Sequence, residues 1–484
     1  MPADPMSLDA LASVCTGAVV GDGSVVVTDV THDSRRAGPG VLFVAVRGRT
    51  TDGHRFVPAA VTAGSPAVCV EVVDATIPAA SMVVADTRAA LAPIAAAVHG
   101  RPSESLRLVG VTGTNGKTTV THLIESMCRS AGIPEAVAGT VGARIRGRSV
   151  PMVRTTPEAP DFQRLLRTMV DSGVDVAAVE VSSHALALGR VDATRFRIGA
   201  FTNLSQDHLD FHGDMASYEQ AKAGLFRQCE RAVIWTDDAA GARIASSLAI
   251  PVVTVGTGGA AAVRVRHADY TFSGSDFVLD DGRVRLTLHV PLAGGFNVAN
   301  AAVAAACGRS LGIDDSAIAS GIAAVEVVPG RFEQVPTEAG FTVVVDYAHT
   351  PDGVAAVIGA ARQILKGSGR VIALVGAGGD RDRAKRPLMG SAACRAHVAI
   401  LTTDNPRNER PEDILTEVAA GARGPAQVIV EIDRRLAIRT ALRMARSGDV
   451  VLVLGKGHEQ TQDFGDHIDP FDDRLVAAEE ARAR

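Results

Sequence analysis

A short run of small, hydroxyl-bearing and basic residues has the composition of a loop that surrounds phosphate groups: Gly113-Thr114-Asn115-Gly116-Lys117-Thr118-Thr119. It follows the apolar segment 106–111 and opens a helical pattern over 118–131, so backbone N–H groups and a helix N-terminus would face one anion. The spacing is a compressed variant, since Val111 stands where the usual pattern has its first glycine. We predict a nucleotide site with Lys117 on the outer phosphates and Thr118 on Mg²⁺; the alternative is a glycine-rich turn with an exposed lysine.

Acidic and imidazole groups follow two later strands of the same region. Glu180 lies at the end of the apolar run 177–181, so its carboxylate should emerge at the carboxyl edge of a sheet, where it could bind Mg²⁺. Segment 203–212 gathers carboxylates and imidazoles beyond another strand, a composition suited to metal or proton chemistry. A polar cap with satisfied histidines explains most of that segment equally well. No His-Glu-x-x-His helix is present, which disfavours a zinc hydrolase.

The elements that must position these groups are short apolar strands separated by helical segments, and this alternation predicts parallel sheets covered on both faces. Small β-branched runs precede the phosphate loop, and segment 328–332 is typical of a linker into a second doubly wound unit. We therefore predict an α/β protein with domains at 1–102, 103–329 and 330–484, the second a P-loop mononucleotide-binding sheet and the third Rossmann-like. The strands expected after the first domain are 106–111, 174–181, 198–201, 232–235, 251–255, 341–346, 371–375, 398–402, 427–432 and 450–454.

The composition narrows the class of protein. Its 484 residues suit three domains at roughly 150 residues each, and a formal net charge of -5 argues against a nucleic-acid partner held by bulk charge. Six scattered cysteines without a Cys-x-x-Cys pair predict reduced thiols. Residues 1–12 carry acidic groups where a signal peptide carries basic ones, and no apolar run approaches membrane-spanning length. We expect a cytoplasmic protein that does not insert into membranes.

The loop Thr112-Gly113-Thr114-Asn115-Gly116-Lys117-Thr118 resembles that of the Mur ligase family, which includes the folylpolyglutamate synthetases. Members have a substrate-anchoring, an ATP-binding and an amino-acid-binding domain. From its helical context, Lys222 would be a solvated surface charge. The resemblance implies instead that Lys222 is carbamylated and ligates the second of two Mg²⁺ ions, chemistry that is reasonable for a lysine of lowered pKa. It also implies a metal-binding role for His208 and nucleotide contacts for Asn300, Asp346 and His349.

Two motifs of the first domain, 32–35 and 48–53, resemble the uridine-nucleotide site of members that act on UDP-muramoyl peptides. The resemblance implies that Ser34 contacts the uridine diphosphate end of the substrate. The residues that match the segments holding the muramoyl-dipeptide are Thr155, Thr156, Ser182 and Arg190. Arg154 and Leu188 stand where some relatives have Asn and Gln, so no role is carried over to them.

The tetrad Asp404-Asn405-Pro406-Arg407 follows the expected strand 398–402. Alone it would be interpreted as a type I turn with a surface arginine. In the family it marks enzymes that add meso-2,6-diaminopimelate, whose distal carboxylate needs the two-pronged grip of an arginine. The resemblance implies that Arg381, Gly455 and Glu459 complete this pocket, with Glu459 receiving an ammonium group.

Taken together, the resemblance implies an ATP-dependent ligase, expected to be a monomer. It would join meso-2,6-diaminopimelate to the D-Glu γ-carboxylate of UDP-N-acetylmuramoyl-L-alanyl-D-glutamate through an acyl phosphate, in peptidoglycan-precursor synthesis. The expected catalytic residues are Lys117, Lys222 and His208, and the expected metal ligands are Thr118, Glu180, His208 and carbamylated Lys222. One alternative is a folylpolyglutamate-type ligase, which would share the loop and the chemistry. Another is a P-loop regulatory ATPase, which would hydrolyse ATP without any amino acid and leaves the third-domain motifs unexplained.

Overall fold

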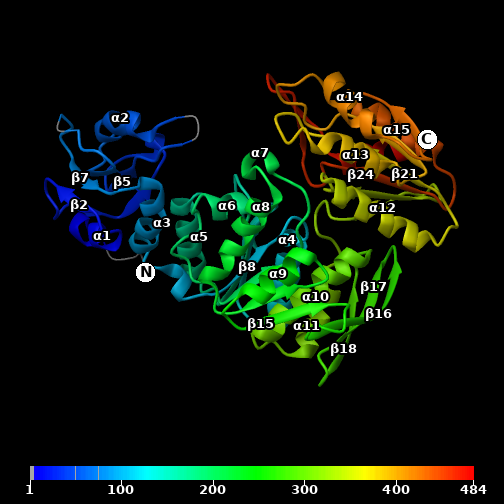
Figure 1. The fold of residues 1–484 in the computed structure, drawn as a ribbon, viewed down its shortest axis with the longest axis horizontal. Helices are drawn as coiled ribbons and strands as arrows, with labels where there is room; N and C mark the ends of the chain where they lie inside the picture. Colours follow the sequence, from blue (N-terminus) through cyan, green and yellow to red (C-terminus); the bar gives the residue numbers. More distant parts are fainter. Residues whose placement is uncertain (1–4, 49–50, 75, 484) are drawn as a thin grey trace.

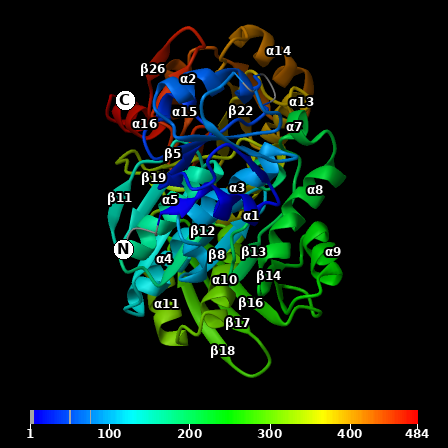
Figure 2. The same ribbon diagram turned by 90° about the vertical axis from the view of Figure 1, so that its left-hand side faces the viewer.

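The computed structural model describes residues 5–48, 51–74 and 76–483. Three units follow one another along the long axis, each built on its own main sheet, with the middle unit between the other two (Figure 1). Figure 2 views the molecule from the end at which the first unit lies. Within the described residues, no helix is long and apolar enough to cross a membrane.

The first unit has a five-stranded sheet in the order β2-β7-β6-β5-β4. The neighbours β4 to β7 run parallel, and β2 is antiparallel to β7. Alternate residues of β5 face opposite sides: Leu42 packs with α1 and α3, and Phe43 packs with α2. The bounds are β2 (Ala18–Val20), β4 (Asp29–Thr31), β5 (Val41–Val44), β6 (Ala67–Val70), β7 (Ala80–Val83), α1 (Leu8–Val14), α2 (Val57–Thr62) and α3 (Thr87–Val98), with the short helix η1 (Ser34–Arg36) after β4.

The middle unit is built on an eleven-stranded sheet in the order β11-β10-β9-β12-β8-β13-β14-β15-β16-β17-β18. Its centre, from β9 to β16, is parallel, as predicted. Both edges are extended by antiparallel strands that the prediction did not include. The bounds are β8 (Arg107–Thr112), β9 (Glu135–Gly139), β10 (Gly142–Ile145), β11 (Arg148–Val150), β12 (Val176–Glu180), β13 (Ile198–Phe201), β14 (Ala232–Trp235), β15 (Val252–Gly256), β16 (Val263–Thr271), β17 (Gly274–Asp280) and β18 (Arg285–Val290).

Helices cover both faces of this middle sheet. On one face lie α4 (Lys117–Ser130), α10 (Gly295–Ser310) and α11 (Asp315–Ala323), which share a core with alternate residues of the strands. The buried run 301–306 of α10 consists mostly of alanine, so this helix packs closely on its neighbours. The opposite face is covered by α5 (Ala159–Asp171) and α9 (Ala239–Ser247).

The third unit has a six-stranded sheet in the order β19-β20-β24-β21-β22-β23, parallel except for β19. One face packs on α12 (Pro351–Leu365), α13 (Lys385–Ala393) and α14 (Pro411–Gly421), and the other on α15 (Arg434–Met444) and α16 (Asp473–Arg482). This is the doubly wound arrangement predicted for the third domain. The strands are β19 (Glu333–Val335), β20 (Thr342–Asp346), β21 (Val371–Val375), β22 (Val398–Leu401), β23 (Gln427–Val430) and β24 (Val450–Leu454).

Candidate functional site

The loop between β8 and α4 packs tightly against α10 and against the residues that follow β13. Gly113 has a φ of +145°, and a Cβ there would lie 1.9 Å from Thr202 Oγ1. Gly116 has a φ of +87°, and a Cβ there would lie 2.2 Å from Asn300 Oδ1. A side chain fits at neither position, so the loop needs glycine in both places.

Lys117 is the first residue of α4, and its side chain turns back over the loop. Its Nζ donates to the carbonyls of Gly113 at 3.0 Å and Thr114 at 2.9 Å. Burial lowers the pKa of this amine below its ordinary value. The predicted phosphate-binding lysine therefore lies directly above the glycine-rich backbone.

Glu180, at the end of β12, is buried and fully engaged. Its Oε1 accepts hydrogen bonds from Thr118 Oγ1 at 2.9 Å and from the Thr140 N–H at 2.8 Å. Its Oε2 accepts from Thr140 Oγ1 at 3.0 Å, and Thr140 Oγ1 also contacts Thr155 Oγ1 at 3.1 Å. A carboxylate and a hydroxyl beside a phosphate loop are the hard oxygen donors that Mg²⁺ prefers. Thr140 is a member of this site that the sequence analysis missed.

Arg331 is a second residue that the sequence analysis missed. It lies in segment 328–332, which we interpreted only as a linker. Its Nη2 donates to Thr118 Oγ1 at 3.0 Å, and its guanidinium lies 4.7 Å from the centre of the Tyr347 ring. The linker therefore brings a positive charge from the third unit to the phosphate loop.

Lys222 belongs to α8 (Met215–Ala223) and is only 1% exposed, so the interpretation as a solvated surface lysine is wrong. Its Nζ donates to the Gly113 carbonyl at 2.7 Å and lies 4.5 Å from the centre of the Tyr218 ring. Burial, aided by the charge of Lys117, holds the pKa of Lys222 well below its usual value. A neutral lysine amine is nucleophilic and can react with carbonyl compounds.

His208 precedes α7 (Leu209–His212) with a left-handed backbone, φ +55°. Its Nε2 lies 3.3 Å from Asp207 Oδ2, and burial lowers its pKa to about 3, so the imidazole is neutral near pH 7. Asp207 is buried between units, 3.3 Å from Lys385 Nζ and 3.7 Å from His349 Nε2. Burial opposes the ionisation of Asp207, but these partners hold its pKa well below the usual value. Among the contacts of the described residues, His208 meets Asp207 rather than Glu180 or Lys222.

Across the part of the chain that the structure describes, no three His, Cys, Asp or Glu side chains are grouped so that they could hold a metal ion. A cation at the phosphate loop would therefore depend on the Thr118 hydroxyl and Glu180 together with oxygens from bound substrate. Four residues were predicted as metal ligands. Thr118 and Glu180 contact each other, and Lys222 contacts the Gly113 carbonyl. His208 lies beside Asp207, which contacts the third unit.

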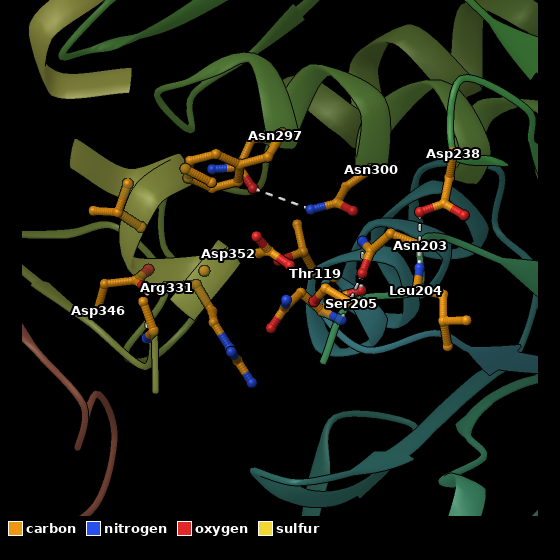
Figure 3. A pocket seen from close by; sticks show the side chains of 17 residues that line it. Thr119, Asn203, Leu204, Ser205, Asp238, Asn297, Asn300, Arg331, Asp346 and Asp352 are labelled. Atoms are coloured by element: carbon orange, nitrogen blue, oxygen red, sulfur yellow. Dashed lines mark hydrogen bonds between the residues drawn. The ribbon is translucent and has the colours of Figure 1, made fainter. Parts of the chain in front are cut away.

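A cavity of about 310 Å³ opens beside the phosphate loop (Figure 3). The loop contributes Asn115, Gly116 and Thr119, and α10 contributes Asn297 and Asn300. The third unit and its linker complete the wall with residues that include Arg331, Asp346, Ala348 and Asp352. Two of the predicted nucleotide contacts, Asn300 and Asp346, thus line this cavity, whereas the third, His349, points its Nε2 toward Asp207.

Asp346 connects the cavity wall to the linker. Its Oδ2 accepts from the Phe332 N–H at 2.6 Å and its Oδ1 from the Ala348 N–H at 2.8 Å. Burial raises the pKa of this carboxyl group. These bonds hold segment 328–332 against the carboxyl end of β20.

The residues predicted to hold the muramoyl-dipeptide gather behind Glu180. Thr156 Oγ1 donates to the Glu180 carbonyl at 2.8 Å and accepts from the Ser182 N–H at 3.1 Å. Arg190 Nη1 donates to the Thr156 carbonyl at 3.2 Å, and Thr155 reaches Glu180 through Thr140. Ser34 lies apart from them, in η1 of the first unit. Arg49 and Thr50 of the predicted uridine motif lie outside the described residues.

At the carboxyl ends of β22 and β24 in the third unit, hydrogen bonds link the tetrad 404–407 to segment 455–459. Asn405 Nδ2 donates to Glu459 Oε2 at 2.8 Å, and Asn405 Oδ1 accepts from Lys456 Nζ at 2.9 Å. Gly455 has a φ of +118°, and a Cβ there would lie 2.4 Å from Asp404 Oδ2. The tetrad and segment 455–459 are therefore interlocked. Lys456 is fully buried and was not predicted.

The Arg407 side chain contacts the neighbouring loop, which follows β21. Its Nη1 donates to the Gly379 carbonyl at 2.7 Å, and its Nε lies 3.7 Å from Asp463 Oδ2. A Cβ on Gly379 would lie 1.8 Å from the Pro406 carbonyl, so the two loops are in direct contact. Arg381 follows on the same loop, is exposed, and donates from Nη1 to the Asp380 carbonyl at 2.9 Å.

Comparison with known proteins agrees with these features along the whole chain. Residues 26–99 match the family model for the Mur ligase family catalytic domain, 111–308 the Mur ligase middle domain, and 330–457 the Mur ligase glutamate ligase domain. The chain is 44% identical over 474 residues to the UDP-N-acetylmuramoyl-L-alanyl-D-glutamate--2,6-diaminopimelate ligase of Geobacillus thermodenitrificans, covering 96% of each chain. It is 43% identical over 484 residues to the enzyme of that name from Streptomyces coelicolor, covering 96% of this chain and 94% of that one.

Solved structures give the same result. A structure of a UDP-N-acetylmuramoyl-L-alanyl-D-glutamate--2,6-diaminopimelate ligase matches with a TM-score of 0.70 and 30% identity, covering 99% of each chain. The Mycobacterium tuberculosis folylpolyglutamate synthase bound to ADP matches with a TM-score of 0.62 at 20% identity, over 76% of this chain and 91% of that one, which shows a shared fold. The chain therefore belongs to the Mur ligase family, which confirms the predicted class of enzyme, an ATP-dependent ligase that forms amide bonds.

Proposed function

We propose that this enzyme adds meso-2,6-diaminopimelate to the D-Glu γ-carboxylate of UDP-N-acetylmuramoyl-L-alanyl-D-glutamate, in the cytoplasmic synthesis of peptidoglycan precursors. The observation that carries the proposal is that the tetrad 404–407 brings Asn405 into contact with Glu459 and Arg407 into contact with the Gly379 loop. An amino acid with charged groups at both ends needs an anion and a cation in one pocket. The names of the two sequence relatives support the same substrates.

Within this pocket the proposal assigns separate tasks to the two charges. Arg407, with Arg381 beside it, grips the distal carboxylate of diaminopimelate, since a guanidinium presents parallel N–H donors to a carboxylate. Glu459 receives an ammonium group, and Asn405 and Lys456 hold its Oε2 in place. Asp404, Pro406 and Gly455 shape the pocket through the interlocked backbone. The third domain, proposed as residues 330–484, is then the amino-acid-binding domain.

ATP is proposed to bind in the cavity of Figure 3, in the middle domain, residues 103–329. Residues 113–119 surround the phosphates, with Lys117 on the outer ones, while Asn300, Asp346 and His349 support the nucleotide from the α10 and third-unit sides. Thr118 and Glu180 fit one Mg²⁺, since both offer oxygen. His208 and carbamylated Lys222 are proposed for a second. Burial lowers the pKa of Lys222 and so favours the neutral amine that carbamylation needs.

The first domain, proposed as residues 1–102, anchors the uridine diphosphate end of the substrate near Ser34. Thr155, Thr156, Ser182 and Arg190 then hold the muramoyl-dipeptide behind Glu180. The carboxylate that must be activated would then meet the terminal phosphate of ATP beside Glu180. The enzyme is proposed to act as a monomer.

The reaction follows from the poor reactivity of a carboxylate toward amines. The D-Glu γ-carboxylate attacks the γ-phosphorus of ATP, the bond to the β-phosphate oxygen breaks, and ADP leaves. The amine of diaminopimelate then attacks the acyl phosphate, phosphate leaves, and the amine loses a proton as the amide forms. Bound Mg²⁺ would supply positive charge at the phosphates. Lys117 and Arg331 add positive charge from the chain itself, so positioning and electrostatics account for most of the catalysis.

The test supplies ATP, Mg²⁺ and UDP-N-acetylmuramoyl-L-alanyl-D-glutamate, then measures phosphate release with one amino acid at a time. Diaminopimelate should trigger rapid release, and lysine only feeble release. Release that depends on glutamate with a folate would instead favour the folylpolyglutamate-type alternative. Release without any amino acid would remove the substrate assignment.

A further inference from the structure

Three arginines from three different segments converge on one buried carboxylate at the boundary of the first and middle units. Glu158, at the start of α5, is 8% exposed. Its Oε2 accepts from Arg88 Nη1 of α3 at 2.8 Å, and its Oε1 lies 2.9 Å from Arg154 Nη1 and 2.8 Å from Arg190 Nη2. Arg88 belongs to the first unit and the other two to the middle unit.

The charges of this cluster do not cancel. Burial opposes the ionisation of Glu158, but Arg190 and Arg88 outweigh it and lower the pKa of the carboxyl group. One negative charge therefore faces three guanidinium groups, which are always protonated, and an excess positive charge remains. The next carboxylate along α5, Asp161, is already paired with Arg36 and Arg164.

Two nearby nitrogen atoms are buried without a hydrogen-bond partner among the described residues. One is Nε of Arg190, and the other is Nδ1 of His32, in the first-unit motif 32–35. His32 lies within electrostatic range of Glu158 and Arg88, since both charges act on its imidazole. Buried polar atoms without partners are costly, and a bound ligand with acceptor oxygens is one reason for keeping them.

We propose that Glu158 is a positioning residue, whose carboxylate holds Arg88, Arg154 and Arg190 together as a clamp for an anionic group of the UDP-linked substrate. This inference rests on the proposed function and extends it. It gives roles to Glu158 and Arg88, for which the sequence analysis expected none, and to Arg154, where this chain departs from some relatives. The group is a phosphate or a carboxylate, the anions whose oxygens match the guanidinium fork.

Hydrogen bonds also connect the clamp to Glu180 beside the phosphate loop. Arg190 donates to the Thr156 carbonyl, and Thr156 Oγ1 donates to the carbonyl of Glu180. Since Arg88 comes from the first unit, an anion held by the clamp would be gripped from both units at once. Glu158 then sets the position of the substrate relative to Glu180 without touching the reacting atoms.

The test compares Glu158→Gln with Asp161→Asn. Both substitutions remove one charge from α5, and both carboxylates accept an arginine of the first unit, Arg88 or Arg36. If Glu158 only docks the two units, the two variants should behave alike. If it positions the clamp, Glu158→Gln should raise KM for UDP-N-acetylmuramoyl-L-alanyl-D-glutamate about tenfold, the effect of losing one charge-assisted hydrogen bond, with little change in KM for ATP. Asp161→Asn should leave both constants within about twofold of the wild type, as expected for a partly exposed ion pair.

Arg154→Gln provides a second variant that the fold should tolerate, since the Arg154 side chain is 54% exposed. It should raise KM for the UDP-linked substrate about threefold or more and spare KM for ATP. The inhibition constant of UDP, measured in the same variants, identifies the anion. If it rises as much as KM for the UDP-linked substrate, the clamp holds the diphosphate. If it is unchanged, the clamp holds a carboxylate.

Equal effects of Glu158→Gln on both Michaelis constants, or equal effects of Glu158→Gln and Asp161→Asn, would overturn the clamp. Failure of the wild-type enzyme to release phosphate with this substrate and any amino acid would instead overturn the proposed function. The two failures are therefore distinguishable.

Discussion

Replacing Arg407 with lysine keeps the positive charge of the proposed diaminopimelate pocket but removes the guanidinium fork. In the structure, Nη1 of Arg407 is engaged with the Gly379 carbonyl at 2.7 Å, while Nε lies at the longer distance of 3.7 Å from Asp463. The side chain is 24% exposed, so it is anchored at one nitrogen and open at the other. A lysine has a single nitrogen, which can contact either Gly379 or a carboxylate in good geometry, but not both through parallel bonds.

The size of the effect follows from the bonds that are lost. One charge-assisted hydrogen bond to the substrate carboxylate is worth about 1.5–3 kcal/mol, and the retained charge of lysine does not restore the second prong. At about 1.4 kcal/mol per factor of ten, Arg407→Lys should raise KM for diaminopimelate roughly 10- to 150-fold. The Michaelis constants for ATP and the UDP-linked substrate should stay within about twofold, because Arg407 contacts neither proposed site.

The assay is steady-state phosphate release with one substrate varied and the other two saturating. Arg410→Lys is the matched control, since Arg410 lies three residues along the same loop, its side chain is 76% exposed, and its Nε lies 3.7 Å from Glu412 Oε2. It should leave all three constants unchanged. A parallel rise in KM for ATP, or an equal effect of Arg410→Lys, would refute the assignment of Arg407 to the amino acid.

Three further substitutions probe the fold and the phosphate loop. Arg434→Met leaves the fully buried Asp473 without its ion-pair partner, so the free energy of unfolding in urea titrations should fall by about 3–5 kcal/mol. The double variant Arg434→Met with Asp473→Leu should recover much of that loss. Gly116→Ala must accommodate a Cβ 2.2 Å from Asn300 Oδ1 at a φ of +87°, so KM for ATP should rise at least about tenfold, and an unchanged value would contradict the loop's role. Removing CO₂ from the buffer should lower the rate and bicarbonate should restore it, because burial lowers the pKa of Lys222 and so favours the neutral amine that reacts with CO₂. Lys222→Met should not respond to bicarbonate, and a wild-type rate insensitive to CO₂ would count against carbamylation.

The central strands could be predicted from sequence because they are buried on both sides and therefore apolar throughout. Segments 198–201, 232–235, 371–375 and 450–454 are strands with the predicted bounds. The hairpin strands β16 to β18 were missed because they lie at an exposed edge, where charged residues alternate with apolar ones and interrupt the apolar run. The charges of β16 include Arg264 and Arg266.

Local motifs of the site were accessible to sequence reasoning, but side chains brought in from a distance were not. The phosphate loop and the tetrad 404–407 are contiguous, so their chemistry can be inferred from order and spacing. Arg331 lies 213 residues from Thr118, and no local pattern indicates that the two side chains touch. The burial of Lys222 was equally hidden, because a short helix with little apolar contrast does not reveal which of its faces is buried.

The third unit contacts both the phosphate loop and the segment that follows β13. Arg331 donates to Thr118, and Lys385 reaches Asp207 beside His208. The cavity beside the phosphate loop is lined from both units, so ATP bound there, as proposed, would stabilise the arrangement of units that builds the cavity. The position of the third unit relative to the middle unit also fixes how far the proposed amino-acid site lies from Glu180. If the binding of ATP and of the amino acid both depend on this arrangement, each ligand must change the affinity for the other by the same factor. If the three substrates are divided among the three units as proposed, the nucleotide whose phosphate activates the carboxylate would also help to position the acceptor amine.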